Sequence, residues 1–246
     1  MMDSFCQFLD WDSDFFGMRI ARVTKNHLSD EIMGSILQWC LDHHIDCLYF
    51  LADGADGTTV RLAEDNHFRF VDIRMTLETQ LSADITAQIS HDDTMIRKSL
   101  PQDIPALRLI AKTSYTDSRF YYDKNFPIHL SNTLYEIWTE KSCQGFADVV
   151  LVAEIESKPI GYISCHLSDE TSGYIGLIAV DEKRRGRQLG QDLVTASLQW
   201  FAEQGVTSVR VVTQGRNCSA QRLYQRCGFL TTEIQLWYHL WFLDTP

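Results

Sequence analysis

The sequence feature that most constrains this chain is an apolar strand that runs through a charged turn into a helix. Residues 178–180 are apolar, residues 181–188 are mostly charged and include Gly186, and a long amphipathic stretch begins near Gly190. The first N–H groups of a helix have no intrahelical partner, and the helix dipole adds partial positive charge at the same point. Glycine lets the backbone come close to a bound group. The segment therefore predicts a phosphate or pyrophosphate site in a β–α turn, although a solvated charged turn would have a similar composition.

A second motif, at residues 217–229, predicts a helix over roughly residues 218–227. Asn217 is a good N-cap, and Gly228 stands just beyond the helix end, where a left-handed residue is favoured. Ala220 and Tyr224 are four residues apart and therefore share one helix face. On that face Tyr224 would serve either in a binding site or as a core aromatic residue.

These two motifs stand roughly 30 residues apart and resemble the acyl-CoA site of the GNAT (Gcn5-related N-acetyltransferase) superfamily. Arg185 and Gly190 match the ends of the family's loop Arg/Gln-x-x-Gly-x-Gly/Ala, and Gln188 stands where its first glycine is usual. Residues 217–229 match its Asn-x-x-Ala-x-x-x-Tyr-x-x-x-Gly-Phe segment. The resemblance implies an α/β (α+β) fold with a mixed central sheet flanked by helices, and acetyl-CoA as co-substrate. It assigns the binding of acetyl-CoA to Ile178, Ala179, Val180, Arg185, Gly186, Arg187, Gln188, Leu189, Gly190, Gln191, Asn217, Ala220 and Tyr224.

The resemblance also implies how acetyl transfer would be catalysed. An amine attacks the thioester through a tetrahedral oxyanion and expels a thiolate. The main-chain N–H of Val180 would stabilise the oxyanion, and Tyr224 would protonate the thiolate as general acid. The group that removes a proton from the incoming ammonium stays open between a water molecule and four side chains near the central strands, Glu154, His166, Asp169 and Glu170.

Further elements are predicted around the two motifs, so that the resemblance covers about residues 91–242. The region opens with a strand at 96–98 and a helix that begins near Pro101. Further strands are predicted at 149–155, 159–166, 173–180, 208–212 and 233–242. A helix over 191–204 places Leu193, Val194, Leu198 and Phe201 on one face.

Residues 1–90 contain a weak copy of the second half of this region. A shift of 161 residues (199 − 38) superimposes identical residues without a gap. The identities include Gln38/Gln199, Trp39/Trp200, Gly54/Gly215, Arg61/Arg222, Leu62/Leu223, Phe68/Phe229 and Ile73/Ile234. Helix, strand, helix and strand should therefore recur in the same order and lengths. Ala63 aligns with Tyr224, so this copy is not expected to bind CoA. We predict a degenerate half-GNAT-like domain at residues 1–90 that forms one wall of the substrate site, and a GNAT N-acetyltransferase domain at residues 91–246.

Composition and charge disfavour several other classes of protein. A net charge of −11 argues against nucleic-acid binding, and no apolar run is long enough to span a membrane. Seven cysteines without paired spacing favour reduced thiols in the cytoplasm. We expect no signal peptide, and no metal ion because His and Cys residues lack metal-ligand spacing.

The expected acceptor is a small-molecule amine, and residues 114–123 supply its candidate binding residues. This segment contains Ser-Arg-Phe followed by tyrosines, and with Phe-Phe-Gly at residues 15–17 it resembles the dTDP-fucosamine acetyltransferase branch of the superfamily. The resemblance implies a nucleotide-linked amino sugar as acceptor. Arg119 would pair with its diphosphate, and Tyr121 or Tyr122 would stack on a base or sugar.

Three alternatives stay open on the sequence. The chain would acetylate amines of a protein, peptide or polyamine, which its acidity favours. It would bind acyl-CoA as a sensor without catalysis, although Tyr224 and Asn217 are both retained. A homodimer would form through the aromatic C-terminal strand, whose residues Trp237, Tyr238, Trp241 and Phe242 alternate between two faces.

Overall fold

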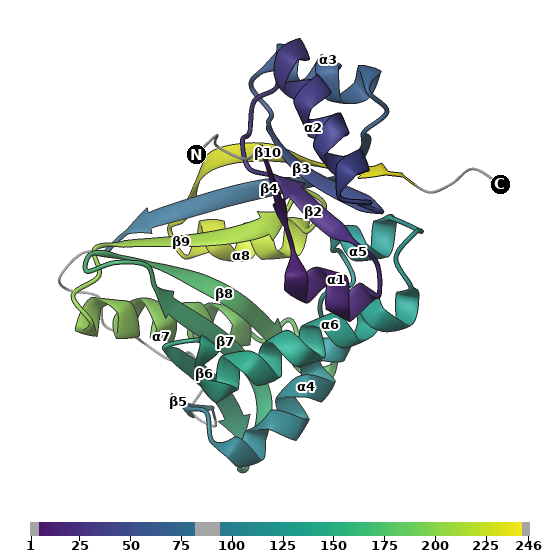
Figure 1. Ribbon diagram of the computed structural model, residues 1–246. Coiled ribbons are helices and arrows are strands. Elements are labelled where there is room, and N and C mark those ends of the chain that lie inside the picture. Colours follow the sequence, from purple (N-terminus) through teal and green to yellow (C-terminus); the bar gives the residue numbers. More distant parts are fainter. Residues whose placement is uncertain (1–4, 82–93, 243–246) are drawn as a thin grey trace.

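The computed structural model describes residues 5–81 and 94–242 of the chain (Figure 1). Its strands are β1 (Cys6–Phe8), β2 (Ile20–Val23), β3 (Cys47–Asp53), β4 (Arg69–Gln80), β5 (Met95–Lys98), β6 (Val149–Ile155), β7 (Lys158–Leu167), β8 (Ser172–Val180), β9 (Ser208–Gln214) and β10 (Leu230–Trp241). Its α-helices are α1 (Asp10–Phe16), α2 (Asp30–Asp42), α3 (Gly57–Asp65), α4 (Ile104–Lys112), α5 (Arg119–Tyr122), α6 (Ile128–Lys141), α7 (Leu189–Glu203) and α8 (Cys218–Arg226). Three short helical turns are η1 (Pro101–Asp103), η2 (Ser142–Phe146) and η3 (Glu182–Arg184).

All ten strands form one sheet in the order β1-β2-β3-β10-β4-β9-β8-β7-β6-β5. The pairs β2–β3 and β8–β9 are parallel and the other pairs are antiparallel, so the predicted mixed sheet is confirmed. Several predicted bounds differ from the observed ones by one to three residues, and two of these differences have a clear local cause. The helix predicted from residue 191 begins at Leu189, directly after the left-handed Gln188. The last strand begins at Leu230 rather than residue 233, because a bulge near Thr231 breaks the alternation that marks a strand.

Among the described residues, helices cover both faces of the sheet but leave its middle open on one face. On the first face, α7 and α8 pack over β6–β9, and α2 and α3 pack over β3 and β10. On the opposite face, α4 and α6 pack over β6 and β7, and α1 and α5 lie against β2, β3 and β10. Figure 1 shows α7 on one side of β6 and β7 and α4 with α6 on the other. Between these two groups of helices the open face presents polar side chains of β4 and β9, including Arg74, Thr76 and Arg210.

The repeat predicted from the sequence recurs in the bounds of the elements. When 161 is added to the residue numbers, β3 coincides with β9, α3 with α8 and β4 with β10. The first and last residues of each pair of elements then agree. Strand pairing follows the same relation, because β3 pairs with β10 as β9 pairs with β4. Arg74 lies opposite its own equivalent, Gln235, and donates a 2.6 Å hydrogen bond to Gln235 Oε1. The middle of the sheet therefore has an approximate twofold axis between these two residues.

The last strand of each copy of the repeat lies between two strands of the other copy. β10 lies between β3 and β4, and β4 lies between β10 and β9. Residues before and after the predicted boundary therefore share one sheet, while the boundary itself, between residues 90 and 91, lies outside the described residues. The aromatic side chains of β10 pack within the chain on both faces, with Tyr238 beside Phe50 on one and Trp237 beside Tyr49 on the other.

Candidate functional site

The parallel strands β8 and β9 separate part-way along their length. Their pairing joins residues 172–175 to residues 208–211, while β8 continues to Val180 and β9 to Gln214. The N–H groups of Leu177 and Asp181 donate toward β7, to Ser164 Oγ and Ile160 O. Because N–H groups alternate in direction along a strand, those of Ile178 and Val180 point into the opened gap. The gap therefore presents main-chain donors to a carbonyl oxygen, among them the predicted donor Val180.

The charged turn after β8 carries backbone N–H groups that are free to bind an anion. Gly186 and Gln188 are left-handed, with φ of 79° and 60°. No described residue accepts a hydrogen bond from the N–H of Gly186, Gln188, Leu189 or Gly190. These groups lie at the start of α7, where the helix dipole favours negative charge. The turn therefore fits the pyrophosphate of an acyl-CoA.

Arg185 ties this turn to the end of the opened strand. Its Nε donates to Val180 O at 3.2 Å, and its terminal nitrogen donates to Ser114 Oγ at 3.2 Å. Gly190 lets α7 approach α8 closely, since a Cβ at this position would lie 3.2 Å from a methyl carbon of Leu223. These contacts hold the charged turn against the end of β8 and hold α7 against α8.

We expect Gln188→Gly to stabilise the folded protein by about 1 kcal/mol. The left-handed region destabilises a residue with a Cβ by about 1–2 kcal/mol but does not destabilise glycine. The greater freedom of glycine in the unfolded chain offsets part of this stabilisation. In a protein of this size that difference raises Tm by roughly 2–4 °C, as measured by differential scanning calorimetry. Gly186→Ala is the matched control and should lower Tm. A lower Tm for Gln188→Gly would contradict strain at this residue.

Tyr224 lies on α8 in the same core cluster as Ile178 and Val180 of the opened strand. The predicted cap of this helix is confirmed, because Asn217 Oδ1 accepts from Ala220 N–H at 3.0 Å. Burial raises the pKa of Tyr224 above its ordinary value of 10, so the side chain stays a phenol at neutral pH. No described residue hydrogen-bonds its hydroxyl. Tyr224 therefore keeps a proton that it can donate.

A cluster of tyrosines lies on the face of the sheet opposite to Tyr224. Tyr115 follows α4, and burial raises its pKa well above the ordinary value. The Tyr115 hydroxyl is 3.1 Å from that of Tyr162, which is 2.7 Å from Thr139 Oγ1. Thr139, Tyr162 and Tyr115 therefore form a chain of hydroxyl groups on the face that α4 and α6 cover.

Arg119, one of the predicted acceptor residues, is held by aromatic rings. Its guanidinium carbon lies 4.1 Å from the ring centroid of Trp237, 4.5 Å from that of Phe120 and 4.8 Å from that of Tyr49. Its Nε is buried without a hydrogen-bond partner, and no described carboxylate forms an ion pair with it. The guanidinium is therefore held by aromatic rings and forms no direct ion pair with a carboxylate of the described residues.

The other two predicted acceptor residues share helix α5 with Arg119 but face different surroundings. Tyr121 donates its hydroxyl hydrogen to Asn132 Oδ1 at 3.0 Å. Tyr122 is exposed, and the Arg216 guanidinium lies over its ring at 3.4 Å. The structure thus places Arg119 in a cavity and places both tyrosines outside the walls of that cavity.

Three adjoining cavities form a groove over the opened strands on the face that the helices leave free. The aromatic cavity, of about 460 Å³, is lined by Trp11, Trp138, Lys141, Ser142, Phe146, His166, Tyr174, Gly176 and Leu177. The central cavity, of about 450 Å³, shares Tyr174 and Gly176 with it and adds Arg74 and Arg210. The arginine cavity, of about 170 Å³, shares Trp138 with the first and Arg74 with the second, and adds Arg119. The groove therefore joins an aromatic cavity to two cavities with basic side chains, beside the gap between β8 and β9.

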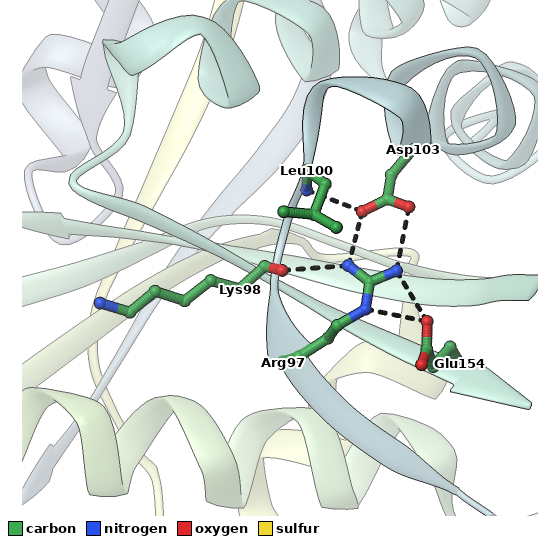
Figure 2. A network of polar contacts seen from close by, with 5 residues as sticks. All are labelled: Arg97, Lys98, Leu100, Asp103 and Glu154. Carbon is green, nitrogen blue, oxygen red and sulfur yellow. Dashed lines mark hydrogen bonds and ion pairs between the residues drawn. The ribbon is translucent and has the colours of Figure 1, made fainter. Parts of the chain in front are cut away.

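Glu154, one of the four candidate bases, is neutralised by an arginine. Arg97 Nε lies 2.8 Å from Glu154 Oε2, and its terminal nitrogens bind both carboxylate oxygens of Asp103 at 2.7 and 3.0 Å (Figure 2). Asp103 also accepts from Leu100 N–H at 2.8 Å. This network joins β5, β6 and the start of α4. Glu154 therefore has a structural role away from the groove.

The remaining acidic candidates also lie outside the groove walls. Asp169 accepts hydrogen bonds from Thr171 N–H and from the N–H and hydroxyl of Ser172, and these bonds lower its pKa to about 2. A carboxylate with this pKa is a poor proton acceptor at neutral pH. Glu170 is exposed in the same turn. Among the four candidates, His166 is the one that lines the groove.

Comparison with known proteins agrees with this arrangement. Residues 111–229 match the model of the acetyltransferase (GNAT) family. These residues belong to the GNAT acetyltransferase family. The match covers the opened strand, the charged turn, α7 and α8, so the predicted family is confirmed. The GNAT fold extends further, because a GCN5-related N-acetyltransferase from Sphaerobacter thermophilus superimposes with a TM-score of 0.69 at 16% identity, over 96% of this chain and 76% of that one.

Two curated relatives match part of this chain. The spore coat polysaccharide biosynthesis protein SpsD of Bacillus subtilis is 30% identical over 57% of this chain and 48% of its own length. The dTDP-fucosamine acetyltransferase of Escherichia coli is 33% identical over 55% of this chain and 58% of its own length. This chain thus spans about half the length of these relatives.

Two features are absent from the described residues. None of their helices is long and apolar enough to cross a membrane. Their His, Cys, Asp and Glu side chains form no group of three that could hold a metal ion.

Sequence reasoning missed the basic residues of the central cavity. Arg74 and Arg210 occupy alternate positions of predicted strands, where a charged residue usually marks a solvated face. They meet because β4, from the first copy of the repeat, pairs with β9, from the second. No local pattern signals this exchange.

Proposed function

We propose that this chain transfers an acetyl group from acetyl-CoA to the primary amine of a nucleotide-linked amino sugar. The observation that carries the choice of acceptor is Arg119, a guanidinium held by three aromatic rings, with no carboxylate partner among the described residues, in a cavity beside the opened strands. Such a group suits a phosphate or diphosphate, which it can bind with two parallel hydrogen bonds.

Further basic charge supports an anionic acceptor. Arg74 and Arg210 line the central cavity. Two acidic residues of the groove are partly compensated, since Asp72 lies 3.6 Å from Arg216 and Glu233 lies 3.9 Å from Arg74. The names of the two relatives, one in polysaccharide biosynthesis and one acting on dTDP-fucosamine, point the same way.

In this proposal the two predicted domains have different roles. Residues 91–246 bind acetyl-CoA, whose thioester supplies the acetyl group. The turn at Gly186–Gly190 holds the pyrophosphate. The N–H of Val180 stabilises the oxyanion, and Tyr224 protonates the leaving thiolate. Residues 1–90 form one wall of the acceptor site, through Trp11, Asp72 and Arg74. We also propose the cytoplasm as its compartment, because all seven cysteines are free thiols.

Release of free CoA thiol tests the proposal with two acceptor panels. The first contains dTDP- and UDP-linked amino sugars, and the second contains polyamines and lysine peptides. We expect turnover with the first panel. Turnover with the second panel alone would overturn the sugar-nucleotide acceptor, and the absence of turnover with both, while acetyl-CoA still binds, would favour a sensor.

A further inference from the structure

His166 lies in the wall of the aromatic cavity, next to the point where β8 and β9 separate. It stands on β7 beside Gly176, the first residue of β8 beyond the last pair with β9. A Cβ on Gly176 would lie 2.6 Å from His166 Nε2. The imidazole therefore lies against the backbone of the opened strand, and any side chain at residue 176 would displace it.

The surroundings of His166 fix its ring and keep it uncharged. The ring stacks on Tyr174, with centroids 4.5 Å apart and planes 4° apart, and meets the edge of Phe146 at 5.5 Å. Burial lowers its pKa below 6.5, while Asp148, on the segment before β6, acts in the opposite direction. The other charged group of the cavity is Lys141 of α6, whose ammonium lies 4.3 Å from the ring centroid of Trp11. A neutral imidazole at pH 7 has a nitrogen lone pair that can accept a proton.

The rest of the aromatic cavity suits the ring that would carry the amine. Trp11, Trp138 and Tyr174 line it. Aromatic faces of this kind pack well against the apolar face of a sugar ring while the polar groups of the sugar point elsewhere. The arginine cavity adjoins it and shares Trp138 with it. A nucleotide-linked sugar would thus place its diphosphate at Arg119 and its amino group beside the gap between β8 and β9.

We propose that His166 is the general base that takes a proton from the ammonium of the acceptor. This role rests on the proposed acetyl transfer. The ammonium gives one proton to His166 Nε2, and the freed lone pair of the nitrogen forms the C–N bond to the thioester carbon. When the C–S bond breaks, the sulfur takes the hydroxyl proton of Tyr224. The surplus proton left on the nitrogen restores the Tyr224 phenol, and His166 returns its own proton to solvent.

The test is the pH dependence of kcat/KM for His166→Gln and wild type, measured by CoA release with the best nucleotide-linked amino sugar. Glutamine keeps a polar side chain of similar length but cannot take up a proton. For wild type we expect kcat/KM to rise to a plateau with a pKa below 6.5. For His166→Gln we expect a loss of roughly 100-fold to 10,000-fold at pH 7, and a tenfold gain per pH unit until the ammonium, with a pKa of about 8–10, ionises by itself. His129→Gln, an exposed histidine on α6, is the matched control and should behave as wild type.

Two further measurements separate this role from folding and from the proposed function. Acetyl-CoA affinity and Tm of His166→Gln should stay close to those of wild type. A merely structural role would lower kcat/KM by the same factor at every pH, and that result would overturn the proposal. Wild-type kcat/KM that stays flat below pH 6.5 would also overturn it, without any need for the variant. If wild type released no CoA at any pH, the proposed function itself would fail.

Discussion

Tyr224→Phe should lower kcat by roughly tenfold to a thousandfold, the range expected when a general acid is lost. The departing thiolate needs a proton, and burial raises the pKa of Tyr224 so that its hydroxyl is protonated at neutral pH. Phenylalanine keeps the ring, which packs 5.7 Å from the ring of Phe229, and removes the hydroxyl alone. Acetyl-CoA affinity should therefore stay within about twofold of wild type, as measured by titration calorimetry.

The structure also predicts that this substitution leaves the fold intact. The Tyr224 hydroxyl has no hydrogen-bond partner among the described residues, so its removal strands no buried polar group. Tyr238→Phe provides the matched control, because Tyr238 is buried in the other half of the sheet and its hydroxyl contacts Glu64. This control should keep full kcat. An unchanged kcat for Tyr224→Phe would remove Tyr224 from the mechanism.

The local backbone structure of the candidate cofactor site could be predicted from the sequence because its signals are local. A helix cap such as Asn217, a left-handed position such as Gly228 and a charged turn between strand and helix each depend on a few consecutive residues. Gln188 shows the limit of such patterns. The structure gives it the left-handed φ that a glycine would adopt, so the shape of the turn is imposed by the fold against the preference of the residue.

Of the three predicted acceptor residues, Arg119 lines a cavity of the candidate acceptor site, and the other walls of that cavity come from distant segments. The repeat indicated which helices and strands recur, but an offset in sequence does not say which strand pairs with which. The exchange of β4 and β10 brings Arg74 beside β9 and Trp237 beside Arg119. Tyr121 and Tyr122 precede Asp123, which accepts from Trp241 Nε1 at 2.8 Å and lies 2.7 Å from His239 Nδ1. These contacts fix the end of α5 in an orientation that its own sequence does not specify.

Arg119→Gln should lower kcat/KM for a nucleotide-linked amino sugar by about 10-fold to 150-fold, the equivalent of 1.5–3 kcal/mol for charged hydrogen bonds to a phosphate. The same substitution should leave kcat/KM for the free amino sugar nearly unchanged, because that acceptor has no phosphate to bind. The ratio of the two acceptors therefore measures the contribution of the guanidinium separately from any general loss of activity. Arg119→Lys should retain part of this ratio, since lysine keeps the charge but not the planar pair of donors.

The control for net charge is Arg69→Gln, which removes one positive charge from an exposed position of β4. Long-range attraction of an anionic acceptor would fall equally in both variants and would be screened by salt. A specific contact at Arg119 would persist at high ionic strength, because aromatic rings surround the guanidinium and its Nε is buried. Equal losses for the two acceptors in Arg119→Gln would contradict the diphosphate site. An unchanged ratio of kcat/KM for the two acceptors would instead indicate that the anionic part of the acceptor binds in the central cavity, between Arg74 and Arg210.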